Sequence, residues 1–384
     1  MTFRYQVIRN YLTFEVSMKI IFHHPSTLGS NTSGSAIRPS EIYRAMLKNG
    51  IEVFEITGSR HHRKEKFDDL KKKIGSGEKF DFFYSEGLTL PINLRLIEPI
   101  SGVKIYVKER LDMKILKFFV KNRIAGGYFV RDIYWDFSDQ TIIHHNRLKQ
   151  KYISKMQAHY GKKEMLFLRK LGIHIFCPTK MFGAYLEKNY DLKSTPLHPG
   201  SAFLDSRVRE INDNMLNVFY VGGVTGGYDA QVFIEGLVKS KSAKFTLCTR
   251  KRDWEDSHLV SFTDHIELVH LSGDDLLESY KMMDLAILPQ PPLEYAKMAF
   301  SLKVAEYIGQ GLPIIAFKGT TMAHIIEENN IGWTIEYNVD AVVEILDHIF
   351  RNRDEYSIRQ QNVLDIQQSF TWEAVVNRIV QQLQ

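Results

Sequence analysis

Short apolar runs alternate with longer polar or helix-like stretches along the whole chain, and this alternation limits the fold more than any other feature of the sequence. The runs have the length of buried strands, and the spacing between them leaves room for helices. Strands that alternate with helices form parallel sheets with helices on both faces, so the sequence predicts an α/β fold. The runs lie at residues 19–23, 52–56, 80–84, 103–107, 127–130 and 173–178, and then at 217–221, 245–249, 265–269, 284–288, 313–317 and 331–335.

The two sets of runs predict two doubly wound domains. A chain of 384 residues exceeds what one hydrophobic core usually holds. The stretch between the two sets carries prolines, a glycine and charges of both signs, which is typical of a linker. We predict an N-terminal domain at residues 1–195, a linker at 196–216, a second domain at 217–352 and C-terminal helices at 353–384. Residues 1–17 precede the first run and resemble an extension.

Composition excludes several classes of protein. A hydrophobic share of 44% with 25% charged residues is ordinary for a globular chain and excludes a disordered or collagen-like one. The two cysteines, Cys177 and Cys248, each end an apolar run, so we expect buried thiols and neither a disulfide framework nor a zinc site. No window reaches the roughly 18 consecutive apolar residues that a spanning helix needs, and the N-terminus is too polar for a secretion signal. We therefore expect a cytoplasmic protein.

Residues 283–317 predict a strand, a proline-broken loop, a short helix and a second strand. Ser301 is the candidate cap of the helix and Gly311 its end. The free amides at residues 299–303 could bind a phosphate, and Glu306, one turn inside the helix, could accept hydrogen bonds from a ribose diol. The alternative is that Glu306 only pairs with a lysine three residues earlier, a surface contact of little energy.

This segment also resembles the donor-site signature of glycosyltransferases of the GT-B fold, family 4 (group 1) in particular. That signature reads K-x-x-E-Y-x-x-x-G-x-P-[IV]-[IV], and the matching residues here are Lys303, Glu306, Tyr307, Gly311, Pro313, Ile314 and Ile315. The resemblance implies two Rossmann-like domains that face each other across a cleft, and a last helix that crosses back to the first domain. It also implies a nucleotide-sugar donor held by Ser301, Leu302, Lys303 and Glu306.

One position departs from the family pattern. Family members carry a second glutamate eight residues before Glu306, where this chain has Met298. If that glutamate normally contacts the donor sugar, then Glu294, Tyr295 or Lys297 must take its place.

Two other stretches of the second domain are candidate donor-binding elements. Residues 221–228 form a strand-to-helix turn whose glycines, Gly222, Gly223 and Gly226 among them, would let backbone approach a diphosphate. An ordinary tight turn explains only some of these glycines. Arg250 and Lys251 end the next strand and could neutralise a leaving diphosphate, although a solvated basic turn is the alternative.

The first domain offers two candidate sites at strand ends. A loop of small residues follows the first strand, and its exposed amides could bind a phosphate or a sugar hydroxyl. The candidate acceptor-side residues of this loop and the helix after it are Gly29, Gly34, Ser35 and Arg38. Arg131 and Asp132 follow the strand at 127–130 and precede aromatic residues that could stack on a sugar or pack in the core. In the family a histidine is frequent where Arg131 stands, so the resemblance does not carry a histidine role to this chain. Arg131 and Asp132 are candidate catalytic residues, and Asp132 is the candidate that orients the sugar or the acceptor.

Residues 104–170 are basic, with 16 lysines and arginines against 6 acidic residues. Within them, residues 110–123 interleave lysines with large apolar side chains. This pattern favours either a helix that lies on an anionic membrane or a core-facing helix with a solvated lysine face. A nucleic acid is not expected as a partner because no recognised binding motif accompanies the charge.

We therefore hypothesise a glycosyltransferase that moves a sugar from a nucleotide diphosphate sugar, a UDP-sugar by preference, to a hydroxyl of a surface glycan or lipid-linked saccharide. The resemblance implies retention of the anomeric configuration. No D-x-D pattern occurs, so we expect neither a metal nor another cofactor. The enzyme would lie in the cytoplasm or at the inner face of the plasma membrane. Two alternatives stay open: a nucleotide-sugar epimerase of the same fold, and a non-catalytic partner subunit that binds a glycan or a membrane.

Overall fold

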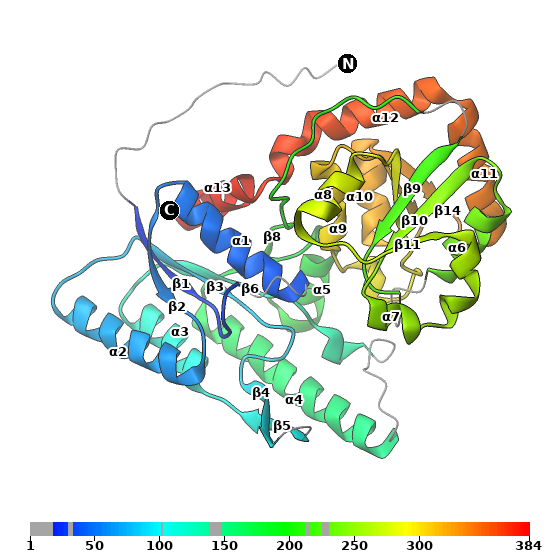
Figure 1. The fold of residues 1–384 in the computed structure, drawn as a ribbon. Coiled ribbons are helices and arrows are strands. Elements are labelled where there is room, and N and C mark those ends of the chain that lie inside the picture. Colours follow the sequence, from blue (N-terminus) through cyan, green and yellow to red (C-terminus); the bar gives the residue numbers. More distant parts are fainter. Residues whose placement is uncertain (1–17, 30–33, 101–102, 138–146, 212–214, 225–229) are drawn as a thin grey trace.

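The computed structural model describes residues 18–29, 34–100, 103–137, 147–211, 215–224 and 230–384. Each half of the chain forms a parallel sheet with helices on both faces (Figure 1). The predicted α/β fold with two doubly wound domains is therefore confirmed. The predicted domain limits are kept as a proposal. The extension at residues 1–17 lies outside the described residues.

The first sheet has the strand order β2-β1-β3-β6-β7-β8, and all its pairs are parallel. Its strands are β1 Lys19–His23, β2 Glu52–Ile56, β3 Phe82–Glu86, β6 Gly126–Phe129, β7 His174–Cys177 and β8 Thr195–Pro196. Its helices are α1 Gly34–Lys48, α2 Arg60–Gly75, α3 Leu111–Lys121, α4 Arg147–Leu171 and α5 Lys180–Tyr190.

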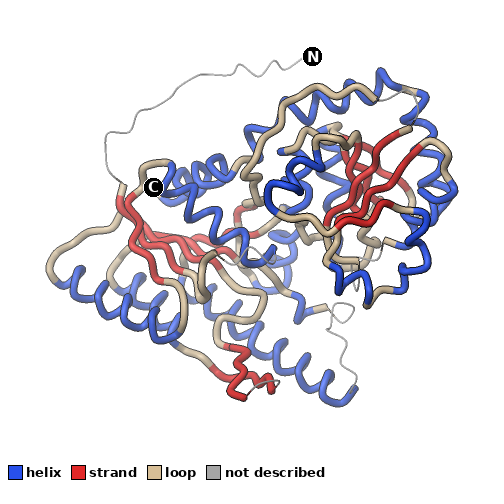
Figure 2. The backbone as a smooth tube through the Cα atoms, in the orientation of Figure 1, coloured by secondary structure: helices blue, strands red, loops and turns tan. Residues whose placement is uncertain are grey.

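The second sheet repeats the scheme with the order β11-β10-β9-β12-β13-β14. Figure 2 shows the strands gathered into two separate sheets. Its strands are β9 Leu216–Val221, β10 Ala243–Cys248, β11 Glu267–Val269, β12 Leu285–Leu288, β13 Ile314–Phe317 and β14 Gly332–Ile335. The helices that follow are α6 Gln231–Lys239, α7 Lys251–Glu255, α8 Gly273–Tyr280, α9 Leu302–Gly309, α10 Thr321–Asn329, α11 Val339–Arg351, α12 Arg353–Ile366 and α13 Trp372–Leu383.

Both faces of each sheet are buried because neighbouring residues of a strand point to opposite sides. In β3, Phe83 packs on the side of α3, while Phe82 and Tyr84 pack on the side of α1. Trp372 and other apolar residues of α13 join this second cluster, and α13 lies against α1 (Figure 1). The last helix therefore packs on the first domain.

In each sheet the order in which the chain adds strands reverses once. The chain leaves β1 toward β2 and then returns to the other side of β1 with β3, and in the second sheet β9 lies between β10 and β12 in the same way. Such switch points leave a crevice at the carboxyl ends of the strands, where doubly wound sheets bind ligands. The ends of β1, β3 and β9 are therefore the places to look for a site.

One local expectation needs correction. The apolar run at residues 103–107 is not a strand of the parallel sheet. It belongs to β5 Val103–Lys108, whose one partner strand among the described residues is β4 Leu94–Ile100, in a separate antiparallel hairpin. A run of apolar residues predicts a strand but does not encode its partner strand.

The prediction for the cysteines is confirmed, because Cys177 and Cys248 are buried free thiols on strands.

The basic segment at residues 110–123 forms α3, and its apolar side faces the protein core. Leu111, Ile115, Leu116 and Phe119 are buried in the first domain, whereas Lys114 is exposed. The core-facing alternative therefore describes this helix, and its apolar side is not available to a membrane. Among the residues described, no helix is long and apolar enough to span a bilayer.

Candidate active site

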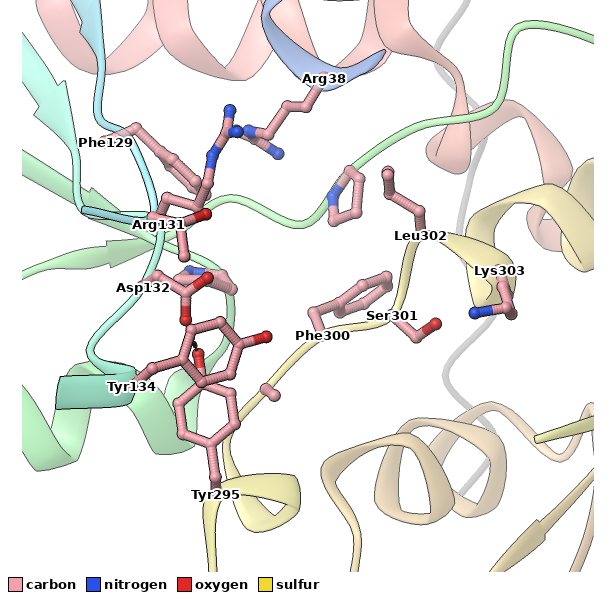
Figure 3. A pocket seen from close by; sticks show the side chains of 14 residues that line it. Arg38, Phe129, Arg131, Asp132, Tyr134, Tyr295, Phe300, Ser301, Leu302 and Lys303 are labelled. Atoms are coloured by element: carbon pink, nitrogen blue, oxygen red, sulfur yellow. Dashed lines mark hydrogen bonds between the residues drawn. The ribbon is translucent and has the colours of Figure 1, made fainter. Parts of the chain in front are cut away.

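A cavity of about 380 Å³ lies between the two domains, where strand ends of the two sheets meet. Side chains of the first domain line one wall and the start of α9 lines the other (Figure 3). We call this cavity the cleft. Of the predicted site residues, it brings together Arg38, Arg131, Asp132, Tyr295, Ser301, Leu302 and Lys303.

Lys303 is the cationic group of the second-domain wall. Its side chain lies across Gly222 at the end of β9, because a Cβ atom at Gly222 would come 2.2 Å from Cε of Lys303. Its amino group also lies 5.5 Å from the ring centre of Tyr220, in a cation–π contact. Burial lowers the pKa of Lys303 to about 8, although Glu306 opposes this shift. A desolvated cation is thus held beside backbone that has no side chain to block a ligand.

Glu306 does not face the cleft itself. It lines an adjoining hollow of about 220 Å³ between α8, the linker and α9, and Leu302 contributes to both spaces. Burial raises the pKa of the Glu306 carboxyl, and the charge of Lys303 acts in the opposite direction. Lys303 therefore lines the cleft and Glu306 lines the adjoining hollow, although both lie on one turn of α9.

The amides before α9 are less available than the sequence suggested. The amide of Ala299 donates to the carbonyl of Tyr295, and the amide of Ser301 contacts the Met322 sulfur at 3.3 Å. The Ser301 side chain occupies the N-cap position but makes no capping hydrogen bond. Within residues 299–303, the amides of Leu302 and Lys303 are in the first helical turn, whose N–H groups have no acceptor inside the helix. The amides of Ala299 and Ser301 are therefore engaged, and those of Leu302 and Lys303 are the helical candidates for the predicted phosphate contact.

The first-domain wall carries two arginines that share one carboxylate. Nε of Arg38 donates to Oε1 of Glu86 at 3.0 Å, and Nη2 of Arg131 donates to Oε2 at 3.3 Å. The hydroxyl of Tyr84 donates to the same Oε1 at 2.6 Å. Glu86 is fully buried, and the Arg38 guanidinium also lies 3.7 Å from the ring centre of Phe129. Both cations are thus fixed at the cleft by packing and by a buried anion.

Glu86 is a site residue that sequence reasoning missed. It stands at the end of β3 next to the switch point, which was the available signal. Its partners lie 48 and 45 positions away in the chain, so no local pattern connects them.

Asp132 joins the two domains at the bottom of the cleft. The hydroxyl of Tyr295, from the loop before α9, donates to Oδ1 of Asp132. The Tyr295 ring also packs 4.4 Å from that of Tyr134 (Figure 3). Burial raises the pKa of Asp132 to about 7, although the Tyr295 hydrogen bond and the Arg131 charge lower it. A carboxyl that exchanges its proton near neutral pH therefore faces the cleft.

The remaining candidates of the second domain lie elsewhere. Arg250 and Lys251 are exposed at the start of α7 and do not line the cleft. Arg250 pairs with Asp253 at 2.8 Å, and a Cβ at Gly223 would lie 3.7 Å from Oδ2 of the same aspartate. The basic turn is thus beside the glycine turn but outside the cavity. Gly226 lies outside the described residues.

On the acceptor side, the loop is described only in part. Gly29 has a positive φ of 96°, and its amide donates to Oγ of Ser40 at 2.9 Å. Gly34 and Ser35 begin α1, and the structure describes their backbone only.

Glu294 and Lys297, two of the three candidates to replace the missing glutamate, form a salt bridge and do not line the cleft. Tyr295 is the one of these three that reaches it.

No group of three potential metal ligands occurs within the part of the chain that the structure describes.

Residues 289–383 match the family model described as the glucosyltransferase 3-like C-terminal domain. A search of curated proteins gives no match.

Solved structures resemble the chain over nearly its whole length. A glycosyltransferase from Rickettsia africae shares 12% identity over 96% of this chain and 98% of its own, with a TM-score of 0.63. WaaG, a glycosyltransferase involved in lipopolysaccharide biosynthesis, shares 14% over 95% and 99%, with a TM-score of 0.59. HepE of Anabaena, solved in complex with UDP, shares 11% over 95% and 99%, with a TM-score of 0.58. The fold is therefore the GT-B fold, and the resemblance inferred from the sequence is confirmed.

Proposed function

We propose that this protein is a glycosyltransferase that moves a sugar from a UDP-sugar to a hydroxyl of a surface glycan or lipid-linked saccharide. The observation that carries the proposal is the placement of Lys303 and Glu306. One turn of α9 presents a desolvated cation to the cleft and a buried carboxylate to the adjoining hollow. A nucleotide diphosphate sugar has an anionic diphosphate between a ribose diol and a sugar. The ribose diol suits the hollow beside Glu306, and the diphosphate and sugar suit the cleft beside Lys303.

In this proposal the nucleoside occupies the hollow. Glu306 accepts hydrogen bonds from the ribose hydroxyls, which a buried carboxylate does strongly. The diphosphate lies across Gly222 within reach of the Lys303 amino group and the N-terminal amides of α9. The helix dipole adds to the attraction because it places positive potential at that end. UDP is the preferred nucleotide because HepE, which shares the fold, was solved with UDP, UDP and glucose, and UDP-glucose.

The donor sugar and the acceptor then share the cleft. Departure of the diphosphate develops negative charge on its oxygens, and cations fixed before the reaction stabilise that charge without reorganisation. The cleft residues supply this stabilisation without a metal ion or another cofactor. Tyr134 and Tyr295 offer ring faces for a sugar, and Asp132 orients a sugar or acceptor hydroxyl. With retention, the acceptor attacks from the face that the phosphate leaves, and a phosphate oxygen takes its proton.

The proposal also includes the location of the enzyme in the cell and the role of two cations outside the cleft. A lipid-linked acceptor places the enzyme at the inner face of the plasma membrane, through the basic residues at 104–170. Arg250 and Lys251 lie beside the glycine turn and outside the cleft, and the proposal keeps them as candidates to neutralise the leaving diphosphate.

The test is a panel of UDP-, GDP- and ADP-sugars, each incubated with the purified protein with and without a mixture of glycan acceptors. The proposal predicts that one UDP-sugar releases UDP in an acceptor-dependent reaction. Isomerised sugar produced without an acceptor would identify an epimerase instead. Failure of every nucleotide to bind would leave the non-catalytic partner subunit as the explanation.

A further inference from the structure

Residues 295–300 of the second domain are built into the first domain. Tyr295 and Met298 belong to the hydrophobic core cluster of the first domain, with 5% and 8% of their surfaces exposed, and Ala299 packs against that cluster. The segment leads into the N-terminus of α9, and Met298 stands five positions before Lys303 (Figure 3). We call residues 295–300 the bridge.

A buried hydrogen bond joins the middle of the bridge to the first domain. The hydroxyl of Thr179 donates to the carbonyl of Met298 at 2.7 Å, and Thr179 is buried. The same hydroxyl oxygen accepts from the amide of Phe182 at 3.0 Å, as the N-cap of α5. Because this hydroxyl both donates and accepts, its direction is fixed. The start of α5 therefore fixes the backbone position of Met298.

Further contacts with the first half of the chain hold the two ends of the bridge. At its start, the hydroxyl of Tyr295 donates to Asp132, and the Tyr295 ring lies 5.4 Å from that of Phe137. At its end, the ring of Phe300 stacks on that of His198, with the ring centres 6.0 Å apart. The bridge is therefore attached along its whole length.

The bridge is also held by α10 of its own domain. The hydroxyl of Thr321 donates to the carbonyl of Lys297, and the amide of Ser301, directly after the bridge, contacts the sulfur of Met322 at 3.3 Å. Thr321 and Met322 both lie in the first turn of α10. If the two domains separate, the bridge must therefore break its contacts either with the first domain or with α10.

Met298 is the position at which the family pattern has a glutamate. Its side chain is buried in the core cluster of the first domain. A carboxylate in that cluster would be an unpaired buried charge, whereas a thioether packs there readily. The departure from the family pattern thus replaces a polar group by an apolar anchor between the domains.

We propose that Thr179 and Met298 are positioning residues that hold the Lys303 wall of the cleft against the Asp132 wall before any substrate binds. The groups on the two walls come from different domains, and aligning them in advance lowers the entropic cost of the reaction. In the free protein the domains are closed, with the bridge in contact with the first domain, and the donor does not have to draw them together. The contacts of the bridge exist whatever the donor is, but its role in catalysis rests on the proposed function.

The experiment measures the separation of the two domains by double electron–electron resonance between nitroxide labels. The labels are placed at two exposed helical positions, Lys188→Cys on α5 of the first domain and Lys239→Cys on α6 of the second. One variant, Thr179→Val, removes the hydrogen bond to the bridge. Another, Met298→Glu, puts a charge into the first-domain core.

Matched controls separate the bridge from general effects on the fold. Ser59→Ala removes an N-cap hydrogen bond from α2, which does not line the cleft. Thr179→Ser keeps the hydroxyl, and Met298→Leu keeps an apolar side chain of similar volume. The protein with only its native Cys177 and Cys248 gives the labelling background, which should be small because both thiols are buried. UDP affinity, turnover and urea unfolding are measured on every variant.

We expect one narrow distance distribution in the wild type, with a centre that does not move when UDP is added. Thr179→Val should lower the ratio of closed to open protein by roughly fivefold, because one hydrogen bond contributes about that factor. Met298→Glu should lower it further, because its charge must leave the core. The kcat should fall in the same order, whereas UDP affinity should stay close to that of the wild type, since the proposed UDP contacts lie on the second domain. The three control variants should keep the wild-type distribution.

Four results would overturn the proposal. They are a wild-type distribution that is broad or that shifts with UDP, variants whose distributions are as narrow as that of the wild type, broadened distributions with an unchanged kcat, and a raised turnover in Met298→Glu, which would show that this position contacts the donor sugar. If Met298→Glu does not fold, Thr179→Val decides alone. If the wild type binds no nucleotide but the variants still broaden the distribution, the bridge stands and the proposed donor is refuted.

Discussion

Lys303 is the residue whose titration is most directly linked to the proposed donor. Burial lowers its pKa to about 8, so the free protein loses this charge within an accessible pH range. A diphosphate prefers the protonated amine. UDP should therefore bind with nearly constant affinity around pH 7, and above about pH 8 binding must be accompanied by uptake of a proton. With a pKa of about 8, the protonated fraction falls roughly tenfold between pH 7 and pH 9, and the association constant should fall by the same factor. An unperturbed lysine, with its pKa near 10.5, would give almost no change in this range.

The assay is isothermal titration of UDP at pH 6 to 9.5, with the variant Lys303→Met as the control. Methionine keeps an unbranched side chain over Gly222 but cannot carry a charge. A hydrogen bond to a charged group contributes about 1.5–3 kcal/mol, so UDP affinity at pH 7 should fall by about 10- to 150-fold, and its pH dependence should vanish. The variant should be no less stable than the wild type, because burial already disfavours the charged amine. A wild-type affinity that stays flat to pH 9, or a variant with the same alkaline decrease, would refute the reasoning.

Three further changes test other parts of the site. Glu86→Gln should lower the free energy of unfolding by about 3–5 kcal/mol in urea titrations, because it leaves the buried Arg38 and the partly buried Arg131 without their shared carboxylate; a change below 1 kcal/mol would show that the anion is not needed. Tyr295→Phe removes a hydrogen bond that lowers the pKa of Asp132, so the acid limb of a pH–rate profile should move upward from about 7, and an unmoved limb would exclude Asp132 as the titrating group. Gly222→Ala should weaken UDP binding and also lower thermal stability, since Gly222 has a φ of 150° that residues with a side chain rarely adopt and the new methyl group meets the end of Lys303; unchanged UDP affinity of the folded variant would place the diphosphate elsewhere.

The regular part of the fold could be predicted from the sequence because each buried strand is a local apolar run. Strands such as β1 and β12 sit where their runs lie, within one or two residues. The hairpin is the exception. The run at residues 103–107 is as apolar as a sheet strand, but it follows β4 so closely that there is no room for a crossover helix, and it pairs antiparallel instead.

The candidate site could be predicted only where one short segment contains it. Lys303 and Glu306 share a helical turn, so their spacing alone brought them together, although the separation into two spaces depends on α8 and the linker. Glu86 was missed because its role arises from two arginines on other elements. Arg250 was a plausible cation on sequence grounds, but its pairing with Asp253 keeps it on the surface, outside the cavity.

The central claim is that Glu306 holds the ribose of a nucleotide. It is tested most directly by titrating UDP and its 2′,3′-dideoxy analogue against the wild type and Glu306→Ala. The account predicts that UDP binds the wild type at least about tenfold more tightly than the analogue, since hydrogen bonds to a charged acceptor are lost. It also predicts that the variant binds both ligands equally and weakly. Equal UDP affinity in the wild type and the variant, or a preference for UDP that survives the substitution, would contradict it.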